Sequence, residues 1–116
     1  MQSVVISPGQ ALKLLHDVSL ELVRDETRDL TQRQLAILLV VYLQPPPHTV
    51  RGLAKYLGVT KPVITRALDT MGRMKLVERR RDEKDRRSVL IRRTLEGALF
   101  LEELGDIISE KAREIS

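Results

Sequence analysis

Two short helical patterns separated by a glycine constrain the fold of this chain more than any other feature. Apolar side chains recur at helical spacing from Thr49, a suitable N-cap, to Gly58, a residue typical of helix C-termini. A second helix is expected after Thr60, which can also act as an N-cap. Its inward-facing residues would be Ile64, Ala67, Leu68 and Met71. Two helices joined by so short a turn indicate a helix-turn-helix.

A hairpin is expected directly after this unit. Residues 76–81 and 88–93 are strand-like runs, the second rich in β-branched side chains, and the segment 82–87 between them is charged and turn-prone. A β-hairpin in this position is the wing of a winged helix. The sequence therefore predicts a mainly α fold with a small β-hairpin wing, a winged helix-turn-helix.

Helical patterns also precede and follow the unit. A first amphipathic helix is predicted over 7–26, and a second one begins after a capping box formed by Thr31 and Gln34. The second helix is apolar nearly all round and stops at the prolines of 45–47, so we expect it to be central. The apolar stripe of the first helix is Leu12, Leu15, Val18 and Leu22, widened by Leu14 and Leu20.

A last helix, capped by Thr94, is predicted over 95–114. Its expected apolar face is Leu95, Ala98, Leu101, Leu104, Ile107 and Ile108. We expect residues 1–116 to form a single winged-helix domain, since the length suits one domain. The helices 7–26 and 95–114 would flank it, partly as core and partly as dimerisation elements.

Positive charge is concentrated in the predicted helix-turn-helix and wing. Residues 49–93 hold 14 of the 20 Lys and Arg but 5 of the 16 Asp and Glu, a balance of +9 within a chain of net charge +4. A polyanion would be attracted to this segment and repelled by the rest. Only three side chains are aromatic, too few for a surface that stacks single-stranded bases. Double-stranded DNA is the predicted partner.

Other classes of protein are disfavoured. The chain has no cysteine, which excludes disulfides and thiolate zinc sites, and its two histidines, His16 and His48, have no evident metal-binding partners. The longest apolar run, 35–43, is less than half a membrane span, and the N-terminus does not resemble a signal peptide. We expect a cytoplasmic protein with no cofactor, and not an enzyme, because no catalytic constellation is visible.

Contacts with DNA can be assigned to particular side chains. The second helix of the motif would enter the major groove by its N-terminal end, where short hydroxyls reach bases or backbone and a long Arg reaches guanine or a phosphate. The predicted major-groove contacts are Thr60, Lys61, Thr65 and Arg66. The wing would place Arg86 and Arg87 in the minor groove, where the negative potential is strong. Further phosphate contacts are predicted for Arg51, Lys55, Arg73 and Arg79.

Two charged residues of the hairpin have open interpretations. Asp85 would orient the wing by holding an Arg side chain in a bidentate pair, or it would only reduce repulsion between the cations. Successive strand residues point to opposite faces, so Arg80 is expected to face away from Arg79 and Arg81 and to pair with a carboxylate.

The predicted helix-turn-helix and wing, with the segments on either side, resemble the MarR family of bacterial transcription regulators. The resemblance covers about 30–97, and its most specific marks are the Asp-x-Arg of the wing at 85–87 and the Thr-x-x-Gly at 94–97. It implies a dimeric winged-helix regulator on a palindromic operator, with the second helix of the motif in the major groove and a wing Arg in the minor groove. It also implies that a small molecule or an oxidant often releases the DNA. The C-terminal helical region is shorter than in most members.

Two positions depart from the family pattern. Lys75 stands where the family usually has Gly, so either it adopts a left-handed conformation at a cost of about 1 kcal/mol or the turn is reshaped and Gly72 ends the helix. Arg93 stands where the family has an apolar residue, which suggests an exposed site or another phosphate contact.

The prediction is a sequence-specific, double-stranded-DNA-binding transcriptional regulator, with a homodimeric repressor as the favoured form. Two alternatives remain at this point. One is a winged helix used for contact with another protein, and the other is a regulator whose release from DNA is controlled by a small-molecule effector.

Overall fold

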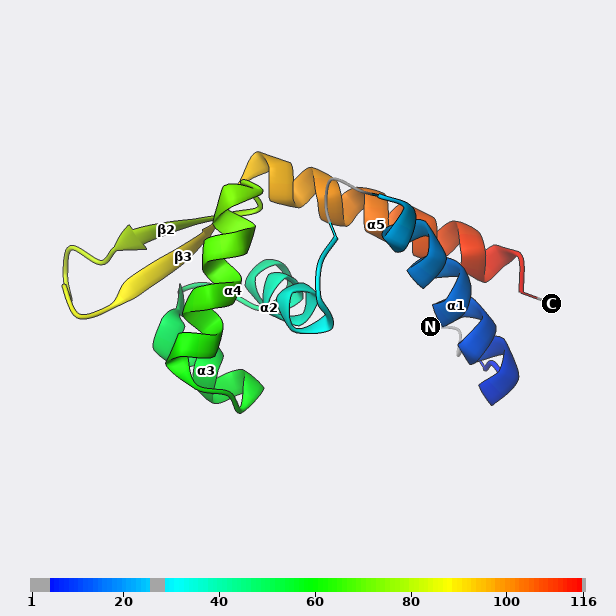
Figure 1. Ribbon diagram of the computed structural model, residues 1–116, viewed down its shortest axis with the longest axis horizontal. Helices are drawn as coiled ribbons and strands as arrows, with labels where there is room; N and C mark the ends of the chain where they lie inside the picture. Colours follow the sequence, from blue (N-terminus) through cyan, green and yellow to red (C-terminus); the bar gives the residue numbers. More distant parts are fainter. Residues whose placement is uncertain (1–4, 26–28, 116) are drawn as a thin grey trace. The chain divides into compact units, whose positions relative to one another are not determined.

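The computed structural model describes residues 5–25 and 29–115, which form two compact units (Figure 1). One unit is Leu30–Phe100; the other joins the N-terminal segment up to Asp29 with the chain from Leu101 onward. The elements are α1 (Pro8–Arg24), α2 (Gln32–Leu43), β1 (His48–Thr49), α3 (Val50–Leu57), α4 (Lys61–Arg73), β2 (Val77–Arg81), β3 (Val89–Arg93) and α5 (Leu95–Arg113). The predicted mainly α, winged helix-turn-helix fold is confirmed.

The sheet has three antiparallel strands in the order β1-β3-β2. Strands β2 and β3 form the predicted hairpin, in register from Val77 opposite Arg93 to Arg81 opposite Val89, and Figure 1 shows it extending away from helices α2, α3 and α4. Strand β1 was not predicted. Its two residues, of which His48 lies opposite Ile91, are too few to produce an alternating pattern in the sequence.

Most helix ends follow the predicted local chemistry. Ser7 and Thr31 each form a capping box, the second with Gln34: the Thr31 hydroxyl accepts the Gln34 N–H at 3.1 Å and the Gln34 side chain accepts the Thr31 N–H at 2.8 Å. Thr49 caps α3, and Gly58 ends it in a left-handed conformation with φ 71°. Residue 26, the predicted end of the first helix, lies outside the described residues.

The core of the unit Leu30–Phe100 lies between α2 and the helix-turn-helix. Ile37, Leu38 and Val41 of α2 are fully buried, which confirms the central position predicted for this helix. The predicted inward face of α4 is also confirmed, with Ile64, Ala67, Leu68 and Met71 all buried. A buried stripe on one side of α4 leaves its other side free to carry polar and charged residues.

The predicted apolar face of α5 is wrong near the start of the helix and at Ile108, which is 40% exposed. Leu95 is 76% exposed and Ala98 is also exposed, whereas Gly97 and Phe100 are buried. The cause is Tyr42 of α2, whose hydroxyl accepts the Thr94 N–H at 2.9 Å and donates to the Leu76 carbonyl at 2.8 Å. Gly97 packs directly on that hydroxyl, so the smallest residue rather than the most apolar one faces inward.

In the unit that contains α1, much of the first helix's apolar stripe is exposed. Val18 is buried, but Leu12 is 68% and Leu15 62% exposed. An ion pair between Lys111 of α5 and Glu21 of α1, at 3.7 Å, belongs to the same unit.

The turn after α4 retains the left-handed conformation. Lys75 has φ 62°, its N–H bonds to the Gly72 carbonyl at 3.0 Å, and the Leu76 N–H bonds to the Met71 carbonyl at 2.9 Å. This pair of bonds is the Schellman arrangement. Of the two alternatives given for this turn, the first therefore holds: Lys75 adopts the left-handed conformation, and Gly72 lies inside α4 rather than ending it.

Arg93 is exposed but does not stand free for a phosphate. Its guanidinium donates to the Val41 carbonyl at 2.9 Å and to the Gln44 carbonyl at 3.0 Å, and it lies 5.8 Å from the centre of the Tyr42 ring. These carbonyls are at the C-terminus of α2, where a cation is favourable. Arg93 thus acts as a cap for α2.

Candidate nucleic-acid interface

The first two turns of α4 carry the predicted major-groove residues. Lys61, Thr65 and Arg66 are all exposed, and none has an ion pair or a side-chain hydrogen bond within the described part of the chain. Thr60 occupies the N-cap position, but its side chain makes no capping hydrogen bond, contrary to the expected N-cap role. Its hydroxyl therefore remains available to a ligand at this end of the helix.

Helix α3, which precedes Thr60 in the chain, also carries exposed cations. Arg51 and Lys55, one helical turn apart, are exposed and have no carboxylate partner among residues 5–25 and 29–115. Arg73, in the last turn of α4, donates only a long hydrogen bond of 3.4 Å to the Thr70 hydroxyl. Unpaired cations beside a helix-turn-helix provide favourable positions for phosphates.

The wing tip exposes Arg86 and Arg87, and neither side chain is paired within the described residues. The tip itself is held by hydrogen bonds: the Asp82 N–H donates to the Ser88 carbonyl at 3.1 Å and the Lys84 N–H to the Asp82 carboxylate at 2.9 Å. The two arginines therefore project from a turn of defined shape.

The Asp85 carboxylate is hydrogen-bonded within the wing tip. It accepts the Arg87 N–H at 3.1 Å and the Ser88 hydroxyl at 3.4 Å. Of the two interpretations, the bidentate pair with an Arg side chain is absent from the described residues, because local N–H and O–H donors occupy the carboxylate instead.

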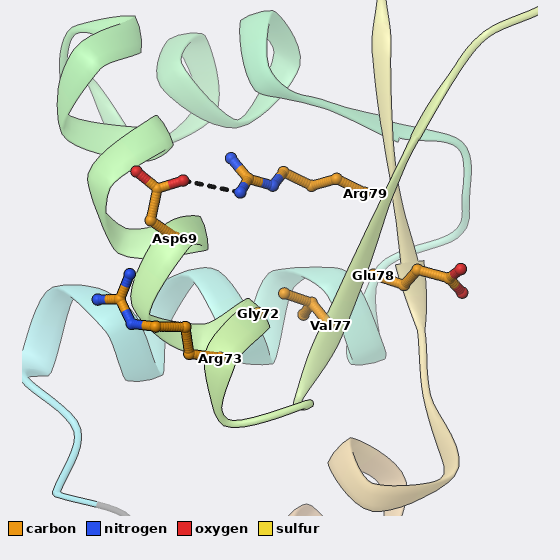
Figure 2. Close-up of a pocket in the computed structure, with 6 residues that line it drawn as sticks. All are labelled: Asp69, Gly72, Arg73, Val77, Glu78 and Arg79. Carbon is orange, nitrogen blue, oxygen red and sulfur yellow. Dashed lines mark ion pairs between the residues drawn. The ribbon is translucent and has the colours of Figure 1, made fainter.

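An ion pair joins the wing to α4. Arg79 of β2 reaches Asp69 of α4 at 2.7 Å, across an open cleft of about 430 Å³ that is also lined by Gly72, Arg73, Val77 and Glu78. Figure 2 shows Arg79 extending toward Asp69 while Glu78 points to the other side of the strand. The pair neutralises a carboxylate on the exposed side of α4 that would otherwise repel phosphates. A direct phosphate contact by Arg79 stays a prediction.

The other hairpin expectation is confirmed. Arg80 donates to Glu78 at 3.0 Å, so both side chains lie on the face of β2 opposite Arg79. The Arg79–Asp69 pair could not be foreseen, since no local spacing relates the two residues.

Neither a cluster of metal-ligating side chains nor a membrane-spanning helix occurs among the described residues. They contain no group of three or more potential metal ligands, and none of their helices is long and apolar enough to cross a membrane. His48 contacts the Gln44 carbonyl at 3.0 Å, and His16 contacts Asp17 at 3.0 Å.

Comparison with known proteins places this geometry in a wider context. The sequence model of the MarR family matches residues 28–88. The S. aureus MepR–DNA complex is 27% identical, covers 88% of this chain and 75% of that one, and has a TM-score of 0.66. A MepR mutant from the same organism, bound to an oligodeoxyribonucleotide, is 25% identical, with coverages of 95% and 82% and a TM-score of 0.75. The Thermotoga maritima transcriptional regulator Tm0710 is similar in fold, with 23% identity, coverages of 90% and 68% and a TM-score of 0.67.

Proposed function

The chain belongs to the MarR family, and from this premise we propose that it is a sequence-specific regulator of transcription that binds double-stranded DNA and acts as a repressor. The observation that carries the proposal is the state of Lys61 and Arg66. Both are exposed in the first turns of the second helix of the motif, and neither has a carboxylate partner in the described residues. The similar MepR structures bound to DNA and to an oligodeoxyribonucleotide support this interpretation.

In this proposal α4 enters the major groove by its N-terminal end. The free Thr60 hydroxyl and the exposed Thr65 would contact bases or backbone, and Lys61 would approach a phosphate or a guanine. The buried stripe of α4 anchors the helix, so these side chains are presented from a rigid support.

The wing follows the adjacent minor groove. Arg86 and Arg87 are compatible with its width and negative potential, and the Asp85 hydrogen bonds fix the turn that presents them. Arg51, Lys55 and Arg73 contact phosphates, while Arg79 mainly neutralises Asp69 and ties the wing to α4.

We further propose that the protein acts as a homodimer on a palindromic operator. The exposed apolar side chains of α1, among them Leu12, Leu15 and Val23, provide a surface for self-association. A twofold pair of winged helices would place its two α4 helices about 34 Å apart, one turn of DNA.

The salt dependence of binding tests the proposal. If about six phosphates are neutralised, a plot of log K against log salt concentration should have a slope of about −5. Fluorescence anisotropy with a labelled duplex measures this slope. The salt concentration is varied from about 50 to about 300 mM, a range over which affinity changes enough to resolve it. A flat response, or no duplex binding at low salt, would contradict DNA binding and favour the protein-contact alternative.

A further inference from the structure

A second cleft of the unit Leu30–Phe100 lies between the first turn of α2 and the exposed side of α4. It has a volume of about 220 Å³ and is lined by Thr31, Arg33, Gln34, Val63, Arg66, Ala67 and Thr70. The two helices pack against each other, so the positions of the lining residues are set by the core of one unit.

The charge of this cleft is uncompensated. Arg33 and Arg66 are exposed, and among the described residues neither forms an ion pair or a side-chain hydrogen bond and no Asp or Glu lines the cleft. Two cationic side chains that line one cleft make it favourable for an anion.

The remaining polar side chains of the cleft already have partners. The hydroxyl oxygen of Thr31 and the side-chain carbonyl oxygen of Gln34 each accept a backbone N–H in the capping box of α2. The Thr70 hydroxyl donates to the Arg66 carbonyl and accepts from Arg73, both at 3.4 Å. The capacity left at this site is therefore mainly that of donors: the two arginines, with the side-chain NH₂ of Gln34 and the Thr31 O–H beside them.

Phosphate is the anion that this arrangement suits. The planar fork of guanidinium matches phosphate oxygens, and a pair of arginines can bind one phosphate from two sides. The volume of the cleft is several times the space of about 30 Å³ that a water molecule occupies, so a phosphate group can enter it.

We propose that Arg33 and Arg66 together bind one phosphate of the DNA backbone, at the edge of the major groove that α4 enters. The inference rests on the proposed function and extends the interface from the winged helix to α2. It also assigns Arg66, for which guanine and phosphate were both open, to the phosphate.

The test compares Arg33→Gln with the wild-type protein on two labelled duplexes, one recovered by selection from a random pool and one of random sequence. Loss of one phosphate contact should weaken binding to both by a similar factor, about three- to tenfold, and make the log–log salt slope shallower by about 0.9. Arg33→Lys, which keeps the charge but not the planar fork, should keep the wild-type slope and lose less affinity than Arg33→Gln. Thermal unfolding should be unchanged because Arg33 is exposed.

A matched control separates this effect from a general loss of charge. Arg113→Gln removes the same charge from an exposed position in the last turn of α5 and should change neither affinity nor slope by a comparable amount. If wild type binds with the expected slope and Arg33→Gln has the same slope and affinity, the phosphate site is overturned and the proposed function stands. A flat slope in wild type overturns the proposed function itself.

Two further measurements distinguish the nature of the ligand. A selective loss for the selected duplex in Arg33→Gln would indicate base reading and overturn the assignment. Inorganic phosphate at constant ionic strength should give no saturable thermal stabilisation of wild type. A saturable stabilisation that Arg33→Gln abolishes would assign the cleft to a free anion and contradict a DNA phosphate.

Discussion

Gly97→Ala is expected to lower the free energy of unfolding by about 3 kcal/mol, the largest loss of stability predicted for a single methyl group in this protein. A Cβ at this position would overlap the Tyr42 hydroxyl and the Leu76 carbonyl oxygen. The hydroxyl could move only by giving up its bonds to Leu76 and Thr94, which join α2 to the starts of β2 and α5. Urea unfolding monitored by circular dichroism measures the change.

Gly72→Ala is the matched control. Gly72 lies inside α4 in the same unit, and a Cβ there would meet nothing within 4 Å. Alanine at an unobstructed helical position stabilises by about 0.5–1 kcal/mol relative to glycine. If Gly97→Ala and Gly72→Ala changed stability alike, the close contact between α5 and Tyr42 would be refuted.

Arg87→Ala is expected to weaken operator binding at least tenfold, which corresponds to about 1.4 kcal/mol. The side chain is exposed at the wing tip and has no intramolecular partner in the part of the chain that the structure describes. The residue's structural contact is its backbone N–H, which Asp85 accepts at 3.1 Å and which alanine retains. Affinity should therefore fall because a minor-groove contact is lost, not because the wing unfolds.

Anisotropy titration with the selected duplex measures this loss, and the melting temperature of the variant should equal that of wild type. Arg113→Ala, at an exposed position away from the wing in sequence, provides the control for net charge. Wild-type affinity in Arg87→Ala would exclude the wing from the mechanism.

Much of the fold follows from local chemistry that can be identified in the sequence. The capping box of Thr31, the helix end at Gly58 and the buried stripe of α4 depend on residues a few positions apart, and all three were predicted correctly. Spacing of this kind carries the information that determines helix ends and helix faces.

Two of the errors arise where distant residues meet. Tyr42 determines which side of α5 is buried, yet it lies 52 positions before Thr94, and hydrophobic periodicity contains no trace of the contact. Strand β1 exists only because β3 lies beside it. Backbone pairing of two residues leaves no pattern that could be detected in advance.

The candidate interface likewise combines residues that local sequence patterns identify with pairs that only the tertiary structure reveals. Exposure of Lys61 and Arg66 follows from the helical stripe, so the sequence was sufficient to select them. The pair of Arg79 with Asp69 and the juxtaposition of Arg33 with Arg66 each involve two elements, and only the tertiary structure brings them together. Arg33 was missed because one arginine beside a capping box has no distinguishing context in the sequence.

The most direct test of sequence-specific, twofold DNA recognition is selection of bound duplexes from a random pool by the purified protein. The account predicts enrichment of a palindrome whose half-sites are about one helical turn apart, 10 to 10.5 base pairs between centres. A pool that shows no enrichment after repeated rounds, or an enriched sequence without twofold symmetry, would contradict it.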